Sequence, residues 1–228
     1  MTLDLSRIKA ICIDVDGTLR ETDDYYVNRV QKLIRPFQAI IPGRDTRKFA
    51  RWLIMRGERP ANYIITIPDM LGIDDEISAL VSRFTSSQSR ENLSKYHMVA
   101  GTELMLSELS KQYPLAVVTS RGQRKTMTFL EKFELVNYFA CIVTAVTAPR
   151  TKPHPAPIIW AAQKMNVKTD ECLMVGDTAY DVIAGNRAGA QTVGVLSGFG
   201  EQKELEAAGA DVILASVVQL PEALKIRS

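Results

Sequence analysis

Ile8-Lys9-Ala10-Ile11-Cys12-Ile13-Asp14-Val15-Asp16-Gly17-Thr18 is the stretch of sequence that decides the fold. Its first six residues are mostly apolar and partly β-branched, a composition typical of a buried strand. Two acidic residues and a glycine follow, and they predict a turn that places Asp14 and Asp16 at the carboxyl end of this strand. Open α/β sheets bind their ligands at that edge. The stretch alone leaves open whether these acids form a functional site or an ordinary turn.

The composition is that of a globular protein, with 46% hydrophobic and 24% charged residues among 228 and a formal net charge of +2. There is no long basic run, so we expect no nucleic-acid partner. No apolar stretch approaches the about 20 residues of a membrane-spanning helix, and the first residues do not resemble an export signal. We therefore expect no membrane association and a cytoplasmic location, with the three cysteines reduced.

From about residue 99 to the end, short β-branched runs alternate with helical patterns, which predicts repeated βαβ units and a parallel sheet. With the first strand, the expected strands span residues 8–13, 115–120, 141–145, 172–176, 192–196 and 212–214. The expected helices span residues 102–112, 123–133, 155–166, 180–188, 202–208 and 217–225. The predicted fold class is α/β, a three-layer α/β/α Rossmann-like core around a mainly parallel sheet.

Residues 20–98 lack this alternation. They show helical patterns at residues 45–56 and 74–83 but no good parallel strand. We therefore predict a helical cap domain over 20–98, inserted after the first strand, and a catalytic core formed by 1–19 and 99–228. Basic residues outnumber acidic ones in the insert. This charge favours a lid over an anionic ligand, although an imbalance of this size also arises by chance.

Three later segments place polar residues at positions comparable to those of Asp14 and Asp16. Thr119-Ser120-Arg121 lies at the end of the strand predicted at 115–120, Lys152 precedes Pro153 at a predicted helix start, and Gly176-Asp177-Thr178-Ala179-Tyr180-Asp181 ends another strand. Taken singly, each has an ordinary reading: a solvated lysine, a residue at a strand end, an acid in the first turn of a helix. In a parallel sheet, however, all strand carboxyl ends share one edge, so these groups are expected to meet in a single site.

The four segments, in this order, resemble the motifs of the haloacid dehalogenase (HAD) superfamily, in its phosphoglycolate phosphatase-like branch. The matching features are DxDGT at residues 14–18, a strand that ends in Thr119, Lys152 before a proline-rich helix start, and GDTxxD at residues 176–181. Residues 193–200 are also similar to that branch. The sequence departs from the family's pattern at Arg20-Glu21-Thr22, where an acid or serine pair is commoner. This departure bears on substrate choice more than on the chemistry.

The resemblance implies a role for each of these residues. Asp14 would attack phosphorus to form an aspartyl phosphate. Asp16 would act as general acid and base, a role that needs a partly protonated carboxyl, and crowding among acids favours this by raising one pKa. Thr119 and Lys152 would hold the phosphoryl oxygens, with help from the Ser120 backbone amide.

The resemblance also implies a magnesium site. Mg²⁺ would be held by Asp14, the backbone carbonyl of Asp16 and Asp177, with Asp181 in the outer shell. A different metal centre is not indicated, because a zinc site would need cysteine or histidine residues in ligand spacing and that pattern is missing from the sequence.

The expected function is therefore a Mg²⁺-dependent phosphatase acting on a small phosphate monoester, such as phosphoglycolate or a sugar phosphate. A phosphomutase, a pyrophosphatase and a nucleotidase on the same scaffold stay open as alternatives. Dehalogenase action is disfavoured, because a halide leaving group needs neither a proton from Asp16 nor a metal at Asp177. A non-catalytic binding protein is disfavoured because it would tolerate loss of the general acid. The expected partner is a small phosphate ester, and the oligomeric state is open.

Overall fold

The computed structural model describes residues 2–21, 31–41, 46, 49–50 and 96–226. The chain divides into two compact units, Met1–Thr22 with Tyr96–Ser228 and, separately, Asp23–Lys95. In the second unit, the 3₁₀ helix η1 spans Arg35–Ile40, and Thr46, Phe49 and Ala50 are helical. The helix predicted at 74–83 lies outside the described residues, as does most of the one predicted at 45–56. The helical cap therefore stays a prediction.

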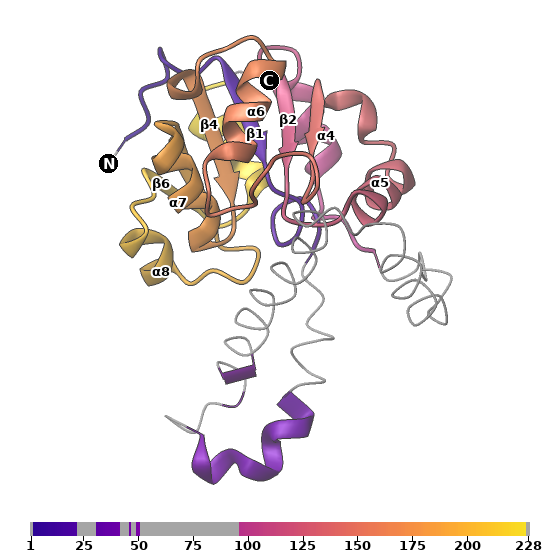
Figure 1. Ribbon diagram of the computed structural model, residues 1–228, viewed down its shortest axis with the longest axis vertical. Coiled ribbons are helices and arrows are strands. Elements are labelled where there is room, and N and C mark those ends of the chain that lie inside the picture. Colours follow the sequence, from indigo (N-terminus) through magenta and orange to yellow (C-terminus); the bar gives the residue numbers. More distant parts are fainter. Residues whose placement is uncertain (1, 22–30, 42–45, 47–48, 51–95, 227–228) are drawn as a thin grey trace. The chain divides into compact units, whose positions relative to one another are not determined.

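The first unit is built on a six-stranded sheet in which every neighbouring pair is parallel. The strands are β1 (Ala10–Ile13), β2 (Leu115–Val118), β3 (Cys141–Val143), β4 (Cys172–Gly176), β5 (Gln191–Val195) and β6 (Val212–Leu214). Their order across the sheet is β3-β2-β1-β4-β5-β6 (Figure 1). All six strands that the sequence predicted are present, and the predicted parallel arrangement is confirmed.

β2 and β3 are shorter than predicted at the edge that carries the polar motifs, whereas β1 begins later than predicted, at Ala10 rather than at residue 8. β2 ends at Val118 rather than at residue 120, and β3 ends at Val143 rather than at residue 145. Beyond β2 the backbone turns on itself, because the Arg121 N–H donates to Thr119 Oγ1 at 3.2 Å. The Ala145 N–H donates to the Arg121 carbonyl, so the ladder gives way to loop contacts at this edge.

Helices cover both faces of the sheet, and side-chain alternation along each strand supplies both faces with apolar contacts. On one face, Ile11 and Ile13 of β1 pack with α4 (Thr102–Leu109), α5 (Gln123–Lys132) and α9 (Leu220–Ala223). On the other face, Ala10 and Cys12 pack with α6 (Ala156–Lys164) and α7 (Ala179–Ala188). The predicted three-layer α/β/α core is therefore confirmed (Figure 1).

The remaining helical elements are short. They comprise α8 (Gln202–Ala207) and the 3₁₀ helices η4 (Val136–Tyr138), η5 (Thr169–Glu171) and η6 (Val217–Gln219). The helix predicted at 217–225 is divided into η6 and α9, with Pro221 in the first turn of α9. Proline fits this position because the first turn of a helix needs no N–H from it.

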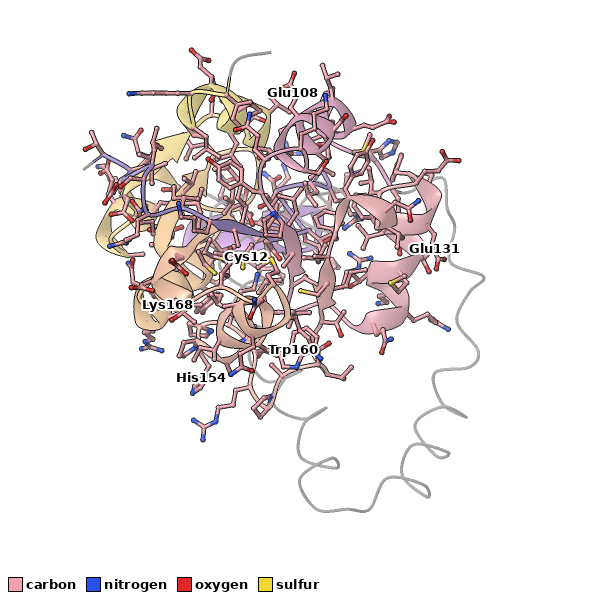
Figure 2. The ribbon with its side chains drawn as sticks, turned by 90° about the horizontal axis from the view of Figure 1, so that it is seen from above. Cys12, Glu108, Glu131, His154, Trp160 and Lys168 are labelled. Carbon is pink, nitrogen blue, oxygen red and sulfur yellow. The ribbon has the colours of Figure 1, made fainter. Side chains whose placement is uncertain are left out.

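All three cysteines are free thiols, as predicted. Cys12 lies fully buried in the interior in Figure 2, whereas Glu108 of α4 and Glu131 of α5 lie at the periphery. Cys141 is only partly buried. In the part of the chain that the structure describes, every helix is too short or too polar to cross a membrane.

Candidate active site

The sheet topology brings the polar motifs to one edge, as the sequence predicted. β1 lies between β2 and β4, so the residues that follow these three strands are neighbours. Asp14 follows β1, Thr119 follows β2 and Asp177 follows β4. The strand order reverses direction at β1, and such a switch point is where open α/β sheets bind ligands.

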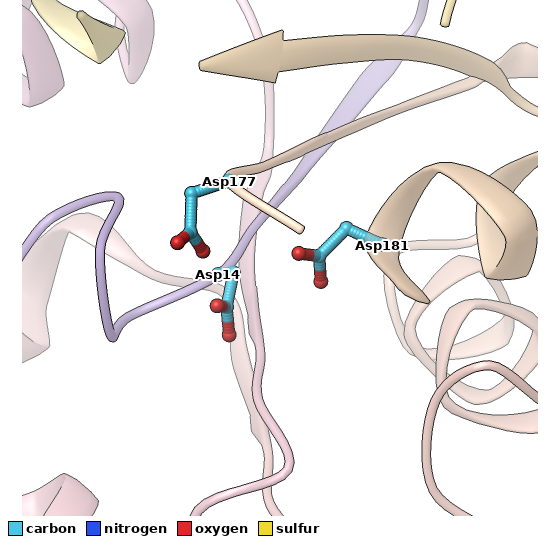
Figure 3. Close-up of side chains that lie close together, drawn as sticks. All are labelled: Asp14, Asp177 and Asp181. Atoms are coloured by element: carbon cyan, nitrogen blue, oxygen red, sulfur yellow. The ribbon is translucent and has the colours of Figure 1, made fainter. Parts of the chain in front are cut away.

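Three carboxylates converge at this point (Figure 3). One oxygen from each of Asp14, Asp177 and Asp181 lies within 4.8 Å of the others. All three residues are buried, with exposed fractions of 7%, 0% and 1%. Buried carboxylates this close together repel one another and need a positive charge between them.

Lys152 supplies one such charge. Its Nζ lies 2.8 Å from Asp14 Oδ1 and 2.5 Å from Asp181 Oδ1, and it donates to the Val118 carbonyl at 2.8 Å. Its side chain is only 4% exposed. The third contact ties Lys152 to the end of β2, so one amine joins Asp14 after β1, Val118 at the end of β2 and Asp181 at the start of α7. The structure therefore brings Lys152 to the carboxylates, as the sequence predicted.

Within the described part of the chain, Asp177 has one carboxylate oxygen that accepts a hydrogen bond and one that does not. Its Oδ2 accepts the Phe199 N–H at 2.7 Å, whereas its Oδ1 is buried and has no hydrogen-bond partner among the described residues. A buried carboxylate oxygen without a partner is costly unless a cation binds it. With Asp14 beside it, this oxygen offers the hard oxygen donors that Mg²⁺ prefers, so the residues present fit a divalent cation.

Glycines enclose Asp177. A Cβ at Gly17 or Gly198 would clash with its carboxylate, and one at Gly200 would clash with its carbonyl oxygen. Gly17 also has φ of 82°, a conformation that side chains disfavour. Ser197 Oγ donates to the Gly17 carbonyl at 2.9 Å and so joins the loop after β5 to the loop after β1. This close approach explains the glycines in both loops.

Asp181 uses its two oxygens differently from Asp177. Its Oδ2 accepts the Thr178 N–H at 3.0 Å and the Thr178 hydroxyl at 2.7 Å, which forms a capping box at the start of α7. Its Oδ1 accepts from Lys152. Because both oxygens are occupied, Asp181 is better suited to orienting Lys152 than to direct coordination. Its position in the outer shell of a metal stays a prediction.

Burial and charge set the protonation of this group. Burial raises the pKa of Asp14 from 3.8 to about 7, although the charge of Lys152 works against this. Burial, together with the charges of Asp181 and Asp14, also raises the pKa of Asp177 well above its ordinary value. Burial disfavours the charged form of Lys152, but Asp14 and Asp181 outweigh it and raise its pKa. Both raised carboxyl pKa values indicate a site that is short of positive charge.

Asp16 departs from the expectation made for it. Its Oδ1 pairs with Arg121 at 2.6 Å and with Arg20 at 2.7 Å, and its side chain is 34% exposed. Burial alone would raise the pKa of Asp16, but the charges of Arg121 and Arg20 lower it below its ordinary value. Burial and crowding among the acids therefore raise the pKa of Asp14 and Asp177, not that of the predicted general acid. Sequence reasoning missed this because both arginines reach Asp16 only through the folded loops.

Thr119 and Ser120, the two remaining predicted residues, lie at the same edge of the sheet. Among the described residues, neither forms a hydrogen bond with the three carboxylates. Thr119 is buried, and its hydroxyl accepts the Arg121 N–H at 3.2 Å. Ser120 is partly buried in the same loop. Their predicted roles as phosphate-binding residues stay predictions.

Sequence reasoning also assigned no role to Arg121 or to the Phe199 amide. The capping box at Thr178 and Asp181 was visible in advance, because a threonine followed three residues later by an acid is its signature. The sequence did mark Arg20 as unusual, since this residue stands where the sequence departs from the family's pattern. No local pattern pointed to the Phe199 amide, because backbone groups carry no sequence signal.

A parallel α/β core with this carboxylate and lysine arrangement defines a hydrolase of the haloacid dehalogenase type. The family model described as haloacid dehalogenase-like hydrolase matches residues 11–195, so the chain belongs to this family. Its relatives include a phosphoglycolate phosphatase from Photobacterium profundum, 27% identical over 96% of each chain. They also include the pyrophosphatase PpaX from Anoxybacillus flavithermus, 28% identical over 97% of this chain and 99% of the relative.

Solved structures give the same result. A hydrolase from Pseudomonas syringae superposes with a TM-score of 0.66 and 27% identity, over 96% of this chain and 100% of that one. A haloacid dehalogenase-like hydrolase from Streptococcus pneumoniae, 22% identical, superposes with a TM-score of 0.66 over 95% and 98% of the two chains and so supports the fold. The predictions of the family, of the core fold and of a phosphatase are thereby confirmed.

Proposed function

We propose that this protein is a Mg²⁺-dependent phosphatase that hydrolyses a small phosphate monoester through an aspartyl phosphate on Asp14. The observation that carries the proposal is the buried cluster of Asp14, Asp177 and Asp181, with Lys152 among the carboxylates and one oxygen of Asp177 left unpartnered. A buried amine together with vacant carboxylate oxygens suits the binding of a phosphate and a cation side by side.

Asp14 is suited to act as nucleophile. Its carboxylate lies at the end of β1, where Lys152 holds Oδ1 and leaves Oδ2 without a hydrogen-bond partner among the described residues. In the proposed reaction Oδ2 attacks phosphorus, the bond from phosphorus to the leaving oxygen breaks, and water later cleaves the aspartyl phosphate. The fixed position of Oδ1 lowers the entropic cost of aligning the attack.

Lys152 is proposed to balance charge as the phosphoryl group is transferred. It already lies within 2.8 Å of Asp14, so it is placed to bind a phosphoryl oxygen next to the nucleophile. Thr119 and the Ser120 amide are proposed to bind the other oxygens from the neighbouring loop. Asp181 orients the lysine rather than contacting substrate.

Asp14 and Asp177 would hold the Mg²⁺ ion, together with the backbone carbonyl of Asp16, and Asp181 would support them from the outer shell. When bound, the ion supplies positive charge that offsets repulsion between Asp14 and the phosphoryl oxygens. The unpartnered Oδ1 of Asp177 and the glycines that enclose this residue support its assignment as a ligand.

Asp16 is proposed to protonate the leaving oxygen and later to accept a proton from the attacking water. It lies two residues beyond Asp14 and is the more exposed of the two carboxylates, which suits a group that faces the substrate. Its two arginine partners hold it in the charged form in the present arrangement. Proton donation therefore requires that substrate binding changes these contacts.

The relatives' names favour a particular kind of substrate. Phosphoglycolate and pyrophosphate, the compounds in those names, both release a leaving group with a negative charge of its own. We infer that the substrate of this protein is a small phosphate of this kind, with phosphoglycolate first among the candidates. A phosphatase acting on such metabolites fits the predicted cytoplasmic location. A pyrophosphatase is the second candidate, and the PpaX relative is the observation that favours it.

The proposal is tested by phosphate release from an aryl phosphate and from a panel containing phosphoglycolate, pyrophosphate, sugar phosphates and nucleotides. We expect activity that needs Mg²⁺ and is removed by a chelator. Asp14→Asn should lower kcat at least about 1,000-fold, because the amide is a poor nucleophile. Asp170→Asn, the same change at an exposed acid, serves as the control.

Activity that survives Asp14→Asn would refute the nucleophile assignment. A phosphomutase would yield a phosphate isomer and little free phosphate, so analysis of the products by phosphorus NMR separates the two reactions.

A further inference from the structure

Arg20 and Arg121 form a small cationic cluster beside the carboxylate triad. They come from the loops after β1 and β2, and both donate to the same oxygen of Asp16, at 2.7 Å and 2.6 Å. Their side chains are only 12% and 13% exposed. Two guanidinium groups therefore share one oxygen of Asp16.

Tyr96 holds this pair in place. The guanidinium groups of Arg20 and Arg121 lie 5.0 Å and 5.3 Å from the centre of its ring, and Arg121 Nη2 donates to the Tyr96 hydroxyl at 3.0 Å. Lys132 in turn donates to the Tyr96 carbonyl at 2.7 Å, and the ring packs edge-on against Phe129. The arginines are therefore preorganised by an aromatic face rather than extended into solvent.

Asp16 is the most exposed member of the cluster, at 34%. An anion that approaches from solvent thus meets Asp16 first and can take over its guanidinium partners. Planar guanidinium groups bind carboxylates and phosphates through paired N–H donors, so both kinds of anion suit this site.

We propose that Arg121, together with Arg20, forms a subsite for a second anionic group on the leaving part of the substrate. This inference rests on the proposed function, which places Asp16 at the leaving oxygen. The substrate's carboxylate or second phosphate replaces Asp16 on the arginines, and the Asp16 carboxyl is released to turn toward the leaving oxygen. Substrates whose leaving group is neutral leave the arginines on Asp16, so they are turned over less well.

The test compares two substrates that differ in one feature. Phosphoglycolate and ethyl phosphate both release a primary alkoxide from phosphorus, but only phosphoglycolate carries a carboxylate on the leaving group. The wild-type protein should show a higher kcat/KM for phosphoglycolate. In Arg121→Gln the ratio of the two kcat/KM values should fall at least about tenfold, because one charge-assisted contact is lost. Arg121→Lys should retain part of the ratio.

The control is Arg124→Gln, which removes an exposed arginine three residues away and should change the ratio less than about twofold. A structural role for Arg121 would lower both kcat/KM values together and leave the ratio intact, and that result would overturn the proposal. A wild-type kcat/KM for phosphoglycolate close to that for ethyl phosphate would also overturn the proposal, and this measurement needs no variant. If no phosphate ester is hydrolysed by the wild type, the proposed function itself fails.

Discussion

Lys152 is the residue on which the charge balance of the site depends. It is the one amine in contact with Asp14 and Asp181 among the described residues, and all three side chains are less than 10% exposed. Removing a partner from a buried ion pair leaves an uncompensated charge, which costs more than the pair itself contributes. Lys152 is therefore expected to contribute to stability as well as to chemistry.

We predict that Lys152→Met lowers the free energy of unfolding by about 3 kcal/mol, near the lower end of the range for broken buried pairs. The lower end applies because the pKa of Asp14 is already raised to about 7, so protonation relieves part of the cost. Urea denaturation at about pH 8 measures this. Lys125→Met, at an exposed lysine of α5, should cost less than about 0.5 kcal/mol. Equal urea midpoints for Lys152→Met and Lys125→Met would contradict the buried ion pairs described between Lys152 and the carboxylates of Asp14 and Asp181.

At the residue level, the sequence predicted where the acids lie but not what each contacts. Asp14 and Asp177 reach one site because strand ends share an edge, which the parallel pattern already implied. The pairing of Asp16 with Arg121 joins residues 105 apart and depends on how two loops fold back. A contact of that kind leaves no local pattern, which is why the lowered pKa of Asp16 was unexpected.

At the level of elements, the loop of residues 197–200 fixes the position of Asp177. Phe199 donates its N–H to the Asp177 carboxylate, and Gly198 lies against the same group without room for a Cβ. The loop follows β5, next to β4 in the sheet, so the segments after two neighbouring strands hold Asp177 in place. A small backbone displacement here would move the carboxylate away from Asp14.

We predict that Gly198→Ala lowers the free energy of unfolding by about 2 kcal/mol, a typical cost of overpacking. It should also weaken Mg²⁺ binding at least about tenfold, since the added methyl group displaces Asp177 from its partners. Gly122→Ala is the matched control, because a Cβ there meets no atom within 4 Å. Urea denaturation and Mg²⁺ titration of both variants test this. Gly198→Ala with the stability and Mg²⁺ affinity of the control would show that the loop adapts freely.

The elements themselves were largely predictable. Apolar runs and helical periodicity located six strands and the helices between them, because core packing imposes those patterns. β2 and β3 were predicted too long, since the β-branched residues Thr119 and Thr144 directly beyond them continue the strand pattern yet belong to the loops. The insert showed helical patterns but no good parallel strand, and its helices predicted at 45–56 and 74–83 stay predictions.

At the scale of the whole molecule, the proposed metal binding would be linked to protonation through Asp14. Its pKa is raised by burial to about 7 in the folded protein without metal. Between its ordinary value of 3.8 and pH 7 the folded state therefore holds a proton that the unfolded chain has released. This group favours folding at low pH, and the contribution is lost as the pH rises through 7. A bound cation would restore this contribution above pH 7, because the cation stabilises the ionised carboxylate of Asp14.

We therefore predict that ionisation of Asp14 makes the affinity for Mg²⁺ rise by about tenfold per pH unit below pH 7, and that this contribution of Asp14 levels off above pH 7. The rise in Tm caused by Mg²⁺ should accordingly be larger at about pH 8 than at about pH 6. Calorimetric titration in buffers of different ionisation enthalpy measures the proton released, and Asp177→Asn should abolish binding at both pH values because a ligand is lost. Equal affinities of the wild type at the two pH values would show that the Asp14 carboxyl is already ionised at pH 6, contrary to the effect of burial described for it.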